Sequence, residues 1–308
     1  MYNIIFMGTP DFAVESLKAI HKAGHNIMLA VSQPDKQQGR NMKMTMTPIK
    51  QFCVENNIEI LQPEKIRKNT EFIEKIKSLN PDVIVVVAYG KILPKEILDI
   101  PRLGCINVHG SLLPEYRGAA PIQWSVINGD KVTGITTMFM DEGMDTGDML
   151  LKKEVDILDN DTYGTLYEKL KVEGGKLLVE TLEKLENITP EKQGNEFTVA
   201  PMIEKSLGEL DFNKTAYELH NLVRGLNPMP GAYFNIEDKV YKVWETEIIN
   251  ENTTLEPGTI IKSDSKNGLQ IQTKDCILSI KIIQAQNSKR MNISDYLRGN
   301  SIDIGIVI

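Results

Sequence analysis

Two polar side chains stand at alternate positions near the end of a short apolar run, in the sequence CINVHG. Because the side chains of a strand alternate between its two faces, Asn107 and His109 lie together on one face, while Ile106 and Val108 pack on the other. Gly110 ends the strand, so the polar pair is expected at the carboxyl edge of a sheet, where open α/β sheets bind ligands. A lone strand histidine is usually structural, but the neighbouring amide and the strand-end position favour a functional site.

A third polar group is available in the sequence DEGMDTGD, a turn that follows the next long strand and contains Asp141, Asp145 and Asp148. The turn lacks the spacing and terminal Glu of a calcium loop, and no second His or Cys is placed to form a zinc site with His109. An Asp, a His and an Asn without a nearby nucleophile indicate acid–base and oxyanion chemistry on a substrate that supplies its own nucleophile. Ser111 is a poor candidate for a hydrolase nucleophile, because HGSLLP lacks the G-x-S-x-G elbow.

The elements that position these residues belong to an α/β domain. Apolar strands alternate with helices along the first half of the chain, which predicts a doubly wound, mostly parallel sheet over residues 1–189. The turn after the first strand, MGTPDFA, lacks the G-x-G-x-x-G fingerprint, so a plain turn is favoured over a dinucleotide site. Residues 33–48 are polar and show no strong period, and we expect an exposed loop there.

The pattern changes in the second part of the chain. Residues 190–206 carry Pro, Gly and mixed charges and are interpreted as a linker. Short alternating runs separated by Gly, Asn or Asp follow in residues 207–308 and predict a small β-barrel. The chain is therefore expected to have two domains joined by a surface segment.

Charge and composition limit the partners. The 308 residues carry a net charge of −7, and residues 206–308 contain eleven Lys and Arg against thirteen Asp and Glu. A nucleic acid would have to bind a local basic face, for which the candidates are Lys281, Lys289, Arg290 and Arg298; solubilising lysines are the alternative. The three cysteines are scattered, no apolar run reaches bilayer length and the N-terminus shows no cleavable leader. We therefore expect a cytoplasmic protein without disulfides.

Four stretches, NVHGSLLPEYRGAAPIQW, MDEGMDTGD, GTPDFA and GLNPMPGAYF, resemble those of the methionyl-tRNA formyltransferases, which are folate-dependent formyltransferases. The likeness runs along nearly the whole chain. It implies a Rossmann-like formyltransferase domain followed by an OB-like domain that binds tRNA. It also implies transfer of a formyl group from 10-formyltetrahydrofolate to the α-amino group of initiator methionyl-tRNA for translation initiation. No metal, membrane or obligate protein partner is implied.

The resemblance also assigns roles to residues. Asn107, His109 and Asp145 would be catalytic. The residues that would bind the folate are Ala88, Tyr89, Gly90, Ile92, Ser111, Leu112, Leu113, Pro114, Asp141 and Gly143. The residues that would contact the acceptor are Phe12, Arg40 and Lys43.

Two stretches depart from the usual family pattern. The loop GRNMKM keeps Arg40 but loses a glycine and a charge, and Met229 stands where the family often has Trp. Two other functions stay open. One is a sugar or other small-amine N-formyltransferase that uses the same three catalytic residues. The other is a catalytically silent RNA-binding protein, which the intact set of Asn107, His109 and Asp145 disfavours.

Overall fold

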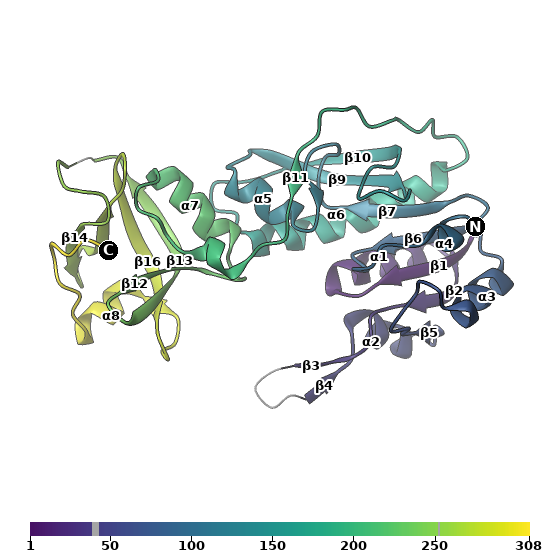
Figure 1. Ribbon diagram of the computed structural model, residues 1–308, viewed down its shortest axis with the longest axis horizontal. Helices are drawn as coiled ribbons and strands as arrows, with labels where there is room; N and C mark the ends of the chain where they lie inside the picture. The colour runs from purple at the N-terminus through teal and green to yellow at the C-terminus, as the bar shows by residue number, and fades with distance from the viewer. Residues whose placement is uncertain (39–42, 252) are drawn as a thin grey trace. The chain divides into compact units, whose positions relative to one another are not determined.

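The structure is a computed structural model that describes residues 1–38, 43–251 and 253–308 (Figure 1). The chain forms two compact units, and neither is one continuous segment. The ranges of the first unit are 1–121, 132–156 and 167–200, and those of the second are 122–131, 157–166 and 201–308. The sequence pattern predicts continuous domains, whereas the short segments 122–131 and 157–166, within the range predicted for the first domain, are grouped with the second unit.

The first unit is built on a seven-stranded sheet with the order β10-β9-β7-β6-β1-β2-β5. Its strands are β1 (Asn3–Gly8), β2 (Asn26–Val31), β5 (Ile60–Leu61), β6 (Val83–Val87), β7 (Cys105–His109), β9 (Val132–Phe139) and β10 (Met149–Asp156). The pairs from β7 to β5 are parallel, and β9 is antiparallel to both β7 and β10. The expected doubly wound, mostly parallel sheet is confirmed.

Helices connect these strands. They are α1 (Asp11–Lys22), α2 (Pro48–Glu55), α3 (Thr70–Leu79), α4 (Lys95–Leu98), α5 (Pro121–Ile127) and α6 (Tyr163–Lys184). Helix α6 packs closely under β7, because a Cβ atom at Gly174 would lie 3.2 Å from Cγ1 of Val108. Val108 therefore faces the core, and the alternation of the strand turns Asn107 and His109 to the opposite face.

The segment from 33 to 48 corrects one expectation. It is not a plain loop, because β3 (Lys36–Gln38) and β4 (Lys43–Thr45) pair antiparallel in it. At its base, the carboxylate of Asp35 accepts hydrogen bonds from Lys50 at 2.5 Å and from Gln62 at 2.8 Å. The two strands contain a single apolar residue, the exposed Met44, so no hydrophobic alternation marks them in the sequence.

The second unit contains a sheet of six antiparallel strands, with β17 paired to β16 beside the path β12-β13-β16-β15-β14. These strands are β12 (Ala232–Ile236), β13 (Lys239–Ile249), β14 (Ile260–Asp264), β15 (Gly268–Gln272), β16 (Ile277–Ala285) and β17 (Met291–Asn292). The helices are η1 (Lys205–Gly208), α7 (Ala216–Gly225) and α8 (Ile293–Gly299). An apolar core that includes Leu219, Phe234 and Ile280 fills the unit, as expected for a small β domain.

Arg224 ties the inserted segments to this unit. The residue is 6% exposed, and its Nη1 donates to the carbonyl oxygens of Asp161 at 2.7 Å and Leu158 at 3.3 Å. Its Nε and Nη2 both donate to Oδ1 of Asn221. The guanidinium thus donates hydrogen bonds to backbone carbonyl groups of the segment 157–166, which lies far away in the sequence.

Replacing this arginine should destabilise the second unit. We expect Arg224→Ala to lower the free energy of unfolding by about 2–4 kcal/mol, because buried carbonyl and amide groups lose a charged donor. Urea denaturation measures the change. Arg298→Ala is the matched control, since Arg298 is 70% exposed and its pair with Asp295 should contribute under about 1 kcal/mol. Equal losses in the two variants would contradict the bridging role of Arg224.

Candidate active site

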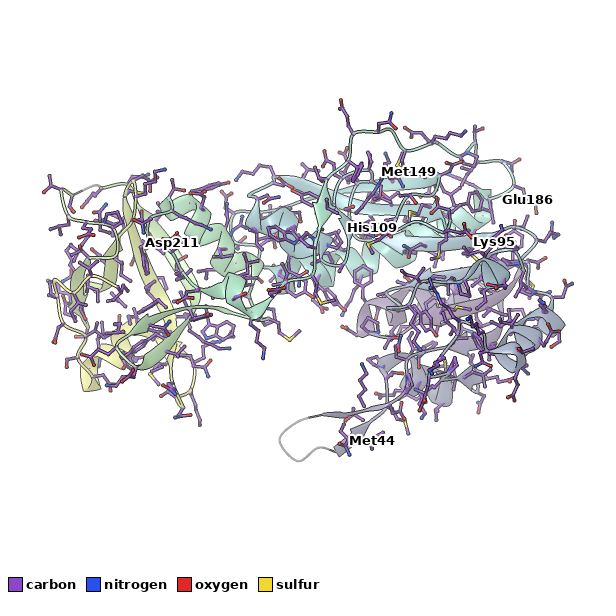
Figure 2. The ribbon with its side chains drawn as sticks, viewed as in Figure 1. Met44, Lys95, His109, Met149, Glu186 and Asp211 are labelled. Atoms are coloured by element: carbon purple, nitrogen blue, oxygen red, sulfur yellow. The ribbon has the colours of Figure 1, made fainter. Side chains whose placement is uncertain are left out.

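Asn107, His109 and Asp145 come together at the carboxyl end of β7 in the first unit, where Figure 2 labels His109. Oδ2 of Asp145 lies 3.7 Å from Nδ1 of His109, and Oδ1 of Asp145 lies 3.4 Å from Nδ2 of Asn107. His109 is 6% exposed, while the other two are partly buried. One carboxylate therefore lies beside both an imidazole and an amide, and Asn107 and His109 share the face of β7 that the strand alternation predicts.

The hydrogen bonds of His109 define which ring nitrogen can exchange a proton. Nε2 lies 2.9 Å from the carbonyl oxygen of Tyr116. A carbonyl oxygen only accepts, so Nε2 carries a proton and donates it. The neutral ring then has its lone pair on Nδ1, the nitrogen next to the Asp145 carboxylate. Nδ1 can take up a proton beside a negative charge.

The carboxylate of Asp145 is positioned by the backbone conformation of its own turn and by a backbone N–H from the loop after β7. Asp145 has φ +54°, a left-handed conformation that Asp tolerates better than most residues. The backbone N–H of Gly118 donates to Oδ2 at 2.9 Å. Gly118 is in β8 (Arg117–Gly118), which pairs in parallel with β11 (Val199–Ala200). Gly118 has φ +120°, a conformation that residues with a Cβ rarely adopt. A Cβ atom there would also lie 2.8 Å from the carbonyl oxygen of Ala200, so any other residue would require the backbone to shift.

The turn between β9 and β10 is ordered from within. Oδ1 of Asp141 accepts hydrogen bonds from Oγ1 of Thr146 at 2.7 Å and from the backbone N–H of Gly143 at 3.0 Å. Asp141 and Gly143 are exposed at the surface of this turn. The turn is thus closed by its own first residue, and backbone groups remain on its outer side.

The loop after β7 is fixed by Thr136 on β9. Its hydroxyl donates to the carbonyl oxygen of Ser111 at 2.7 Å and accepts from the backbone N–H of Leu113 at 3.0 Å. Ser111 is fully buried, and its hydroxyl donates to the carbonyl oxygen of Glu115 at 2.6 Å. A hydroxyl bonded into its own loop is not presented to a substrate, which agrees with the low rank of a hydrolase mechanism. Leu112 and Pro114 in this loop are half-buried.

The residues after β6 differ in exposure. Ala88, Gly90 and Ile92 are exposed, whereas the Tyr89 ring is 2% exposed and belongs to the core. Burial raises the pKa of the Tyr89 hydroxyl to about 12, so that group stays protonated. Its backbone carbonyl accepts hydrogen bonds from Gln33 at 3.1 Å and Thr9 at 3.4 Å. Tyr89 is therefore buried as a whole, and its backbone carbonyl is already bonded within the first unit.

The residues expected to contact an acceptor are less completely described. Phe12 is 6% exposed, and its ring centroid lies 5.2 Å from that of Tyr167. Its backbone N–H donates to the Tyr167 hydroxyl at 3.1 Å, which itself donates to Asp11 at 2.6 Å. Arg40 lies outside the described residues, and the side chain of Lys43 does too.

Two residues near the site have no role assigned from the sequence pattern: the role of Arg117 is left open by it, and Gln193 is not singled out. Arg117 is 9% exposed, and its guanidinium lies 4.4 Å from the centroid of the Phe197 ring. Its Nε donates to Oε1 of Gln193 at 2.9 Å. Gln193 lies in the segment interpreted as a linker, and contacts across this many positions leave no period in a sequence.

Within the described part of the chain, no group of three or more His, Cys, Asp or Glu side chains is arranged to hold a metal ion. A helix long and apolar enough to cross a membrane is likewise not found among those residues.

Comparison with known proteins assigns the chain. A family model described as formyl transferase matches residues 2–182, and one described as formyl transferase, C-terminal domain, matches residues 202–301. The chain belongs to the formyl transferase family. It is 54% identical over 309 residues to a methionyl-tRNA formyltransferase of Clostridioides difficile (strain 630), covering 99% of both chains. It is 50% identical over 308 residues to the enzyme of that name from Ruminiclostridium cellulolyticum, covering 98% of both. The resemblance of the sequence motifs is confirmed, and the chain is a formyl-transferring enzyme.

Solved structures with this fold are more distant in sequence. WlaRD, a sugar 3N-formyl transferase, has a TM-score of 0.66 at 22% identity and covers 93% of this chain and 97% of its own. HypX from Aquifex aeolicus in complex with tetrahydrofolic acid has a TM-score of 0.63 at 14% identity and covers 99% of this chain and 50% of its own. At these identities the likeness concerns the fold.

Proposed function

We propose that the protein transfers the formyl group of 10-formyltetrahydrofolate to the α-amino group of initiator methionyl-tRNA, in the cytoplasm, for translation initiation. The observation that carries the proposal is the convergence of Asn107 and His109 on the Asp145 carboxylate. It occurs in a chain that is similar over 99% of its length to relatives named methionyl-tRNA formyltransferase.

Formyl transfer to an amine needs a proton acceptor. The amine attacks as a neutral nucleophile and must lose a proton as its bond to the formyl carbon forms. In the proposed mechanism Nδ1 of His109 takes that proton, since Nε2 is already committed to the carbonyl oxygen of Tyr116. The Asp145 carboxylate, 3.7 Å from Nδ1, places a negative charge beside the ring as the proton arrives. The same proton can then be returned to the leaving nitrogen.

The attack also places negative charge on the formyl oxygen. A neutral amide donor that is already oriented stabilises such charge without reorganisation. Nδ2 of Asn107 is oriented by its contact with Asp145, at 3.4 Å, and the amide has a second N–H to offer. We assign Asn107 to this donor role.

The formyl donor is proposed to bind along the carboxyl ends of β6 and β7 and the turn between β9 and β10. The residues assigned to this site are Ala88, Tyr89, Gly90, Ile92, Ser111, Leu112, Leu113, Pro114, Asp141 and Gly143. Of these, Tyr89, Ser111 and Leu113 are buried and would shape the loops rather than contact the donor directly. Ala88, Gly90 and Gly143 are exposed residues whose backbone groups can pair with the edge of a pterin ring, although Gly143 can offer only its carbonyl, because its N–H donates to Asp141. The donor supplies the formyl group, and these residues orient it.

The acceptor is proposed to contact Phe12, Arg40 and Lys43, the last of which is carried by β4 of the paired strands. The buried ring of Phe12 would help to shape the site for the methionyl side chain rather than cover it from outside. Basic side chains suit the phosphates of a tRNA arm.

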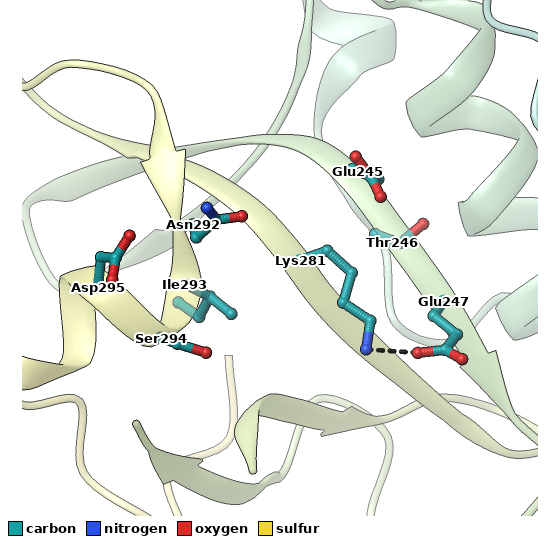
Figure 3. A pocket seen from close by; sticks show the side chains of 8 residues that line it. All are labelled: Glu245, Thr246, Glu247, Lys281, Asn292, Ile293, Ser294 and Asp295. Carbon is teal, nitrogen blue, oxygen red and sulfur yellow. Dashed lines mark ion pairs between the residues drawn. The ribbon is translucent and has the colours of Figure 1, made fainter. Parts of the chain in front are cut away.

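The second unit offers a local basic surface, but two of the candidate cations are neutralised. Lys281 forms an ion pair with Glu247 in a cavity of about 650 Å³ (Figure 3). The cavity is also lined by Glu245 and Asp295, and Asp295 pairs with Arg298 at 2.7 Å. With three carboxylates and one ammonium group, this cavity is a poor site for phosphates.

A better candidate surrounds Trp244 on β13. The Arg290 guanidinium lies 3.7 Å from the centroid of the Trp244 ring, and Nζ of Lys242 lies 5.6 Å from it. In the described part of the chain, Lys242, Lys289 and Arg290 have no carboxylate within ion-pair distance. We propose these three cations, the basic face, as the contact of the second unit with tRNA phosphates.

Loss of one of these charges should weaken acceptor use. We expect Arg290→Ala to raise the KM for methionyl-tRNA by about three- to ten-fold and to reduce the salt dependence of kcat/KM by about one counterion. Lys281→Ala is the matched control and should change both values little, because Lys281 already pairs with Glu247. Steady-state kinetics at several salt concentrations give both values. Equal effects in the two variants would show that the basic face does not bind the acceptor.

One assay tests the proposed function against its alternative. The protein is incubated with 10-formyltetrahydrofolate and either methionyl-tRNA or nucleotide-linked amino sugars, and the formylated amine is identified by mass spectrometry. Sugar N-formyltransferases share the fold, so the sugar is a fair competitor. Formylation of the tRNA-linked methionine with no sugar product supports the proposal. The reverse result would overturn it.

A further inference from the structure

Gln193 is the polar residue that connects the turn of Asp145 to the rest of the first unit. In the fully described stretch 191–199, its side chain is the one that is not exposed. The stretch is fastened by backbone bonds on both sides of it. Glu191 pairs with Met149, with N···O distances of 2.8 and 2.9 Å, and the backbone N–H of Arg117 donates to the carbonyl oxygen of Thr198 at 2.9 Å. The Gln193 side chain is thus directed inward from an anchored segment.

The amide of Gln193 uses both N–H groups and its oxygen. Nε2 donates to the carbonyl oxygens of Asp145 and Gly147, each at 2.8 Å. Oε1 accepts from Nε of Arg117 at 2.9 Å. The opposite orientation of the amide would place its oxygen against two carbonyl oxygens and its NH₂ group against a donor. Chemistry therefore defines the orientation.

These bonds join the two loops that hold the Asp145 carboxylate. Gln193 holds the turn of Asp145 by the carbonyl groups of Asp145 and Gly147. Asp145 has the left-handed φ of +54°, so the bonds fix an unusual backbone conformation. The loop that carries Arg117 also supplies the backbone N–H of Gly118, which donates to Oδ2 of Asp145. A shift of either loop would change the distance of 3.7 Å between Oδ2 and Nδ1 of His109.

We propose that Gln193 is a positioning residue for formyl transfer, whose amide holds the Asp145 turn and the Arg117 loop in the register that directs the carboxylate to His109. The inference rests on the proposed catalytic role of Asp145. Gln193 bonds to the turn at Asp145 and Gly147, whereas the part of the turn proposed to bind the donor is closed separately by Asp141, so Gln193 should affect the reacting groups more than substrate binding.

Three substitutions of Gln193 test this role. Gln193→Glu keeps the length and the acceptor for Arg117 but replaces the two donors by an oxygen that faces two carbonyl oxygens. Gln193→Met keeps a similar volume and removes all three bonds, and Gln193→Asn keeps the amide on a shorter stem. We expect each to lower kcat by about ten- to a hundred-fold, as small misplacements of reacting groups do. The KM values for the formyl donor and methionyl-tRNA should stay within about two-fold. Asn195→Ala, at an exposed position of the same segment, should match the parent enzyme.

The outcomes separate the inference from simpler roles. Parent-like kcat in Gln193→Glu would show that the side chain serves only Arg117 and would overturn the inference. So would a loss confined to KM. Thermal melting confirms that each variant is folded at the assay temperature, and if Gln193→Met is not, the other two variants decide. Asp145→Asn is measured alongside: an active variant removes the catalytic role of Asp145. Inactive Asp145→Asn with parent-like Gln193 variants overturns only the role of Gln193.

Discussion

We expect His109→Ala to lower kcat for formyl transfer by about 10²–10⁴-fold, because it removes the group proposed to accept the proton of the attacking amine. The ring is 6% exposed, and Nδ1 is the nitrogen left free by the bond from Nε2 to Tyr116. The loss should appear in kcat and kcat/KM alike, since the proton moves only in the transition state. Rapid-quench measurement of formylmethionyl-tRNA gives the rate of the chemical step.

The control separates chemistry from packing. His21→Ala removes an exposed imidazole from α1 and should leave the rate unchanged. Free imidazole added to His109→Ala should restore part of kcat, because a small base can enter the space that the side chain leaves. If kcat of His109→Ala did not depend on the imidazole concentration, or if it were close to that of the parent without imidazole, His109 would not be the proton acceptor.

Local signals in the sequence were sufficient to predict the strand that carries Asn107 and His109 and the turn that carries Asp145. The run CINVHG shows the strand, its period of two places Asn107 beside His109, and the turn after the next long strand supplies Asp145. In the structure, Asn107 and His109 both lie next to the carboxylate of Asp145. A strand end and a turn can be predicted because each depends on neighbours within a few residues.

Other features depend on partners far away in the chain. Gln193 bonds to groups 46, 48 and 76 residues earlier in the chain, and a segment of mixed polar residues gives no hint of that. Arg224 likewise reaches Asp161, 63 residues away, so the inserted segments of the second unit were not foreseen. The strands β3 and β4 are held by backbone pairing, and with Met44 as their one apolar residue they leave no hydrophobic pattern to detect.

The same long-range contacts explain why the second unit is not a simple appendage. Ile127 packs against the apolar core of this unit, and Arg224 donates to carbonyl groups of the segment 157–166. Removing residues 201–308 would leave these carbonyl groups and the side chain of Ile127 without their partners. Residues 1–200 alone are therefore a poorer test of tRNA binding than substitutions in the basic face.

Asn107→Ala should lower kcat by about 10²–10³-fold, the usual effect of removing one donor to a developing oxyanion. Asn107 is neutral and cannot transfer a proton, so its proposed contribution is confined to the charge on the formyl oxygen. A donor used only in the transition state lowers kcat and kcat/KM equally, and KM for either substrate should change by less than about two-fold. Single-turnover kinetics with saturating formyl donor measure the loss.

Two further variants at this position define the cause. Asn107→Leu keeps the size of the side chain without a donor and should match Asn107→Ala. Asn107→Asp places a second carboxylate near Oδ1 of Asp145, which lies 3.4 Å from the amide nitrogen, and should be at least as slow, because like charges repel and no N–H remains. The control is Asn195→Ala, at an exposed position. A parent-like rate in Asn107→Leu would show that the amide does not stabilise the oxyanion, and the donor would then have to be sought in the backbone around the site.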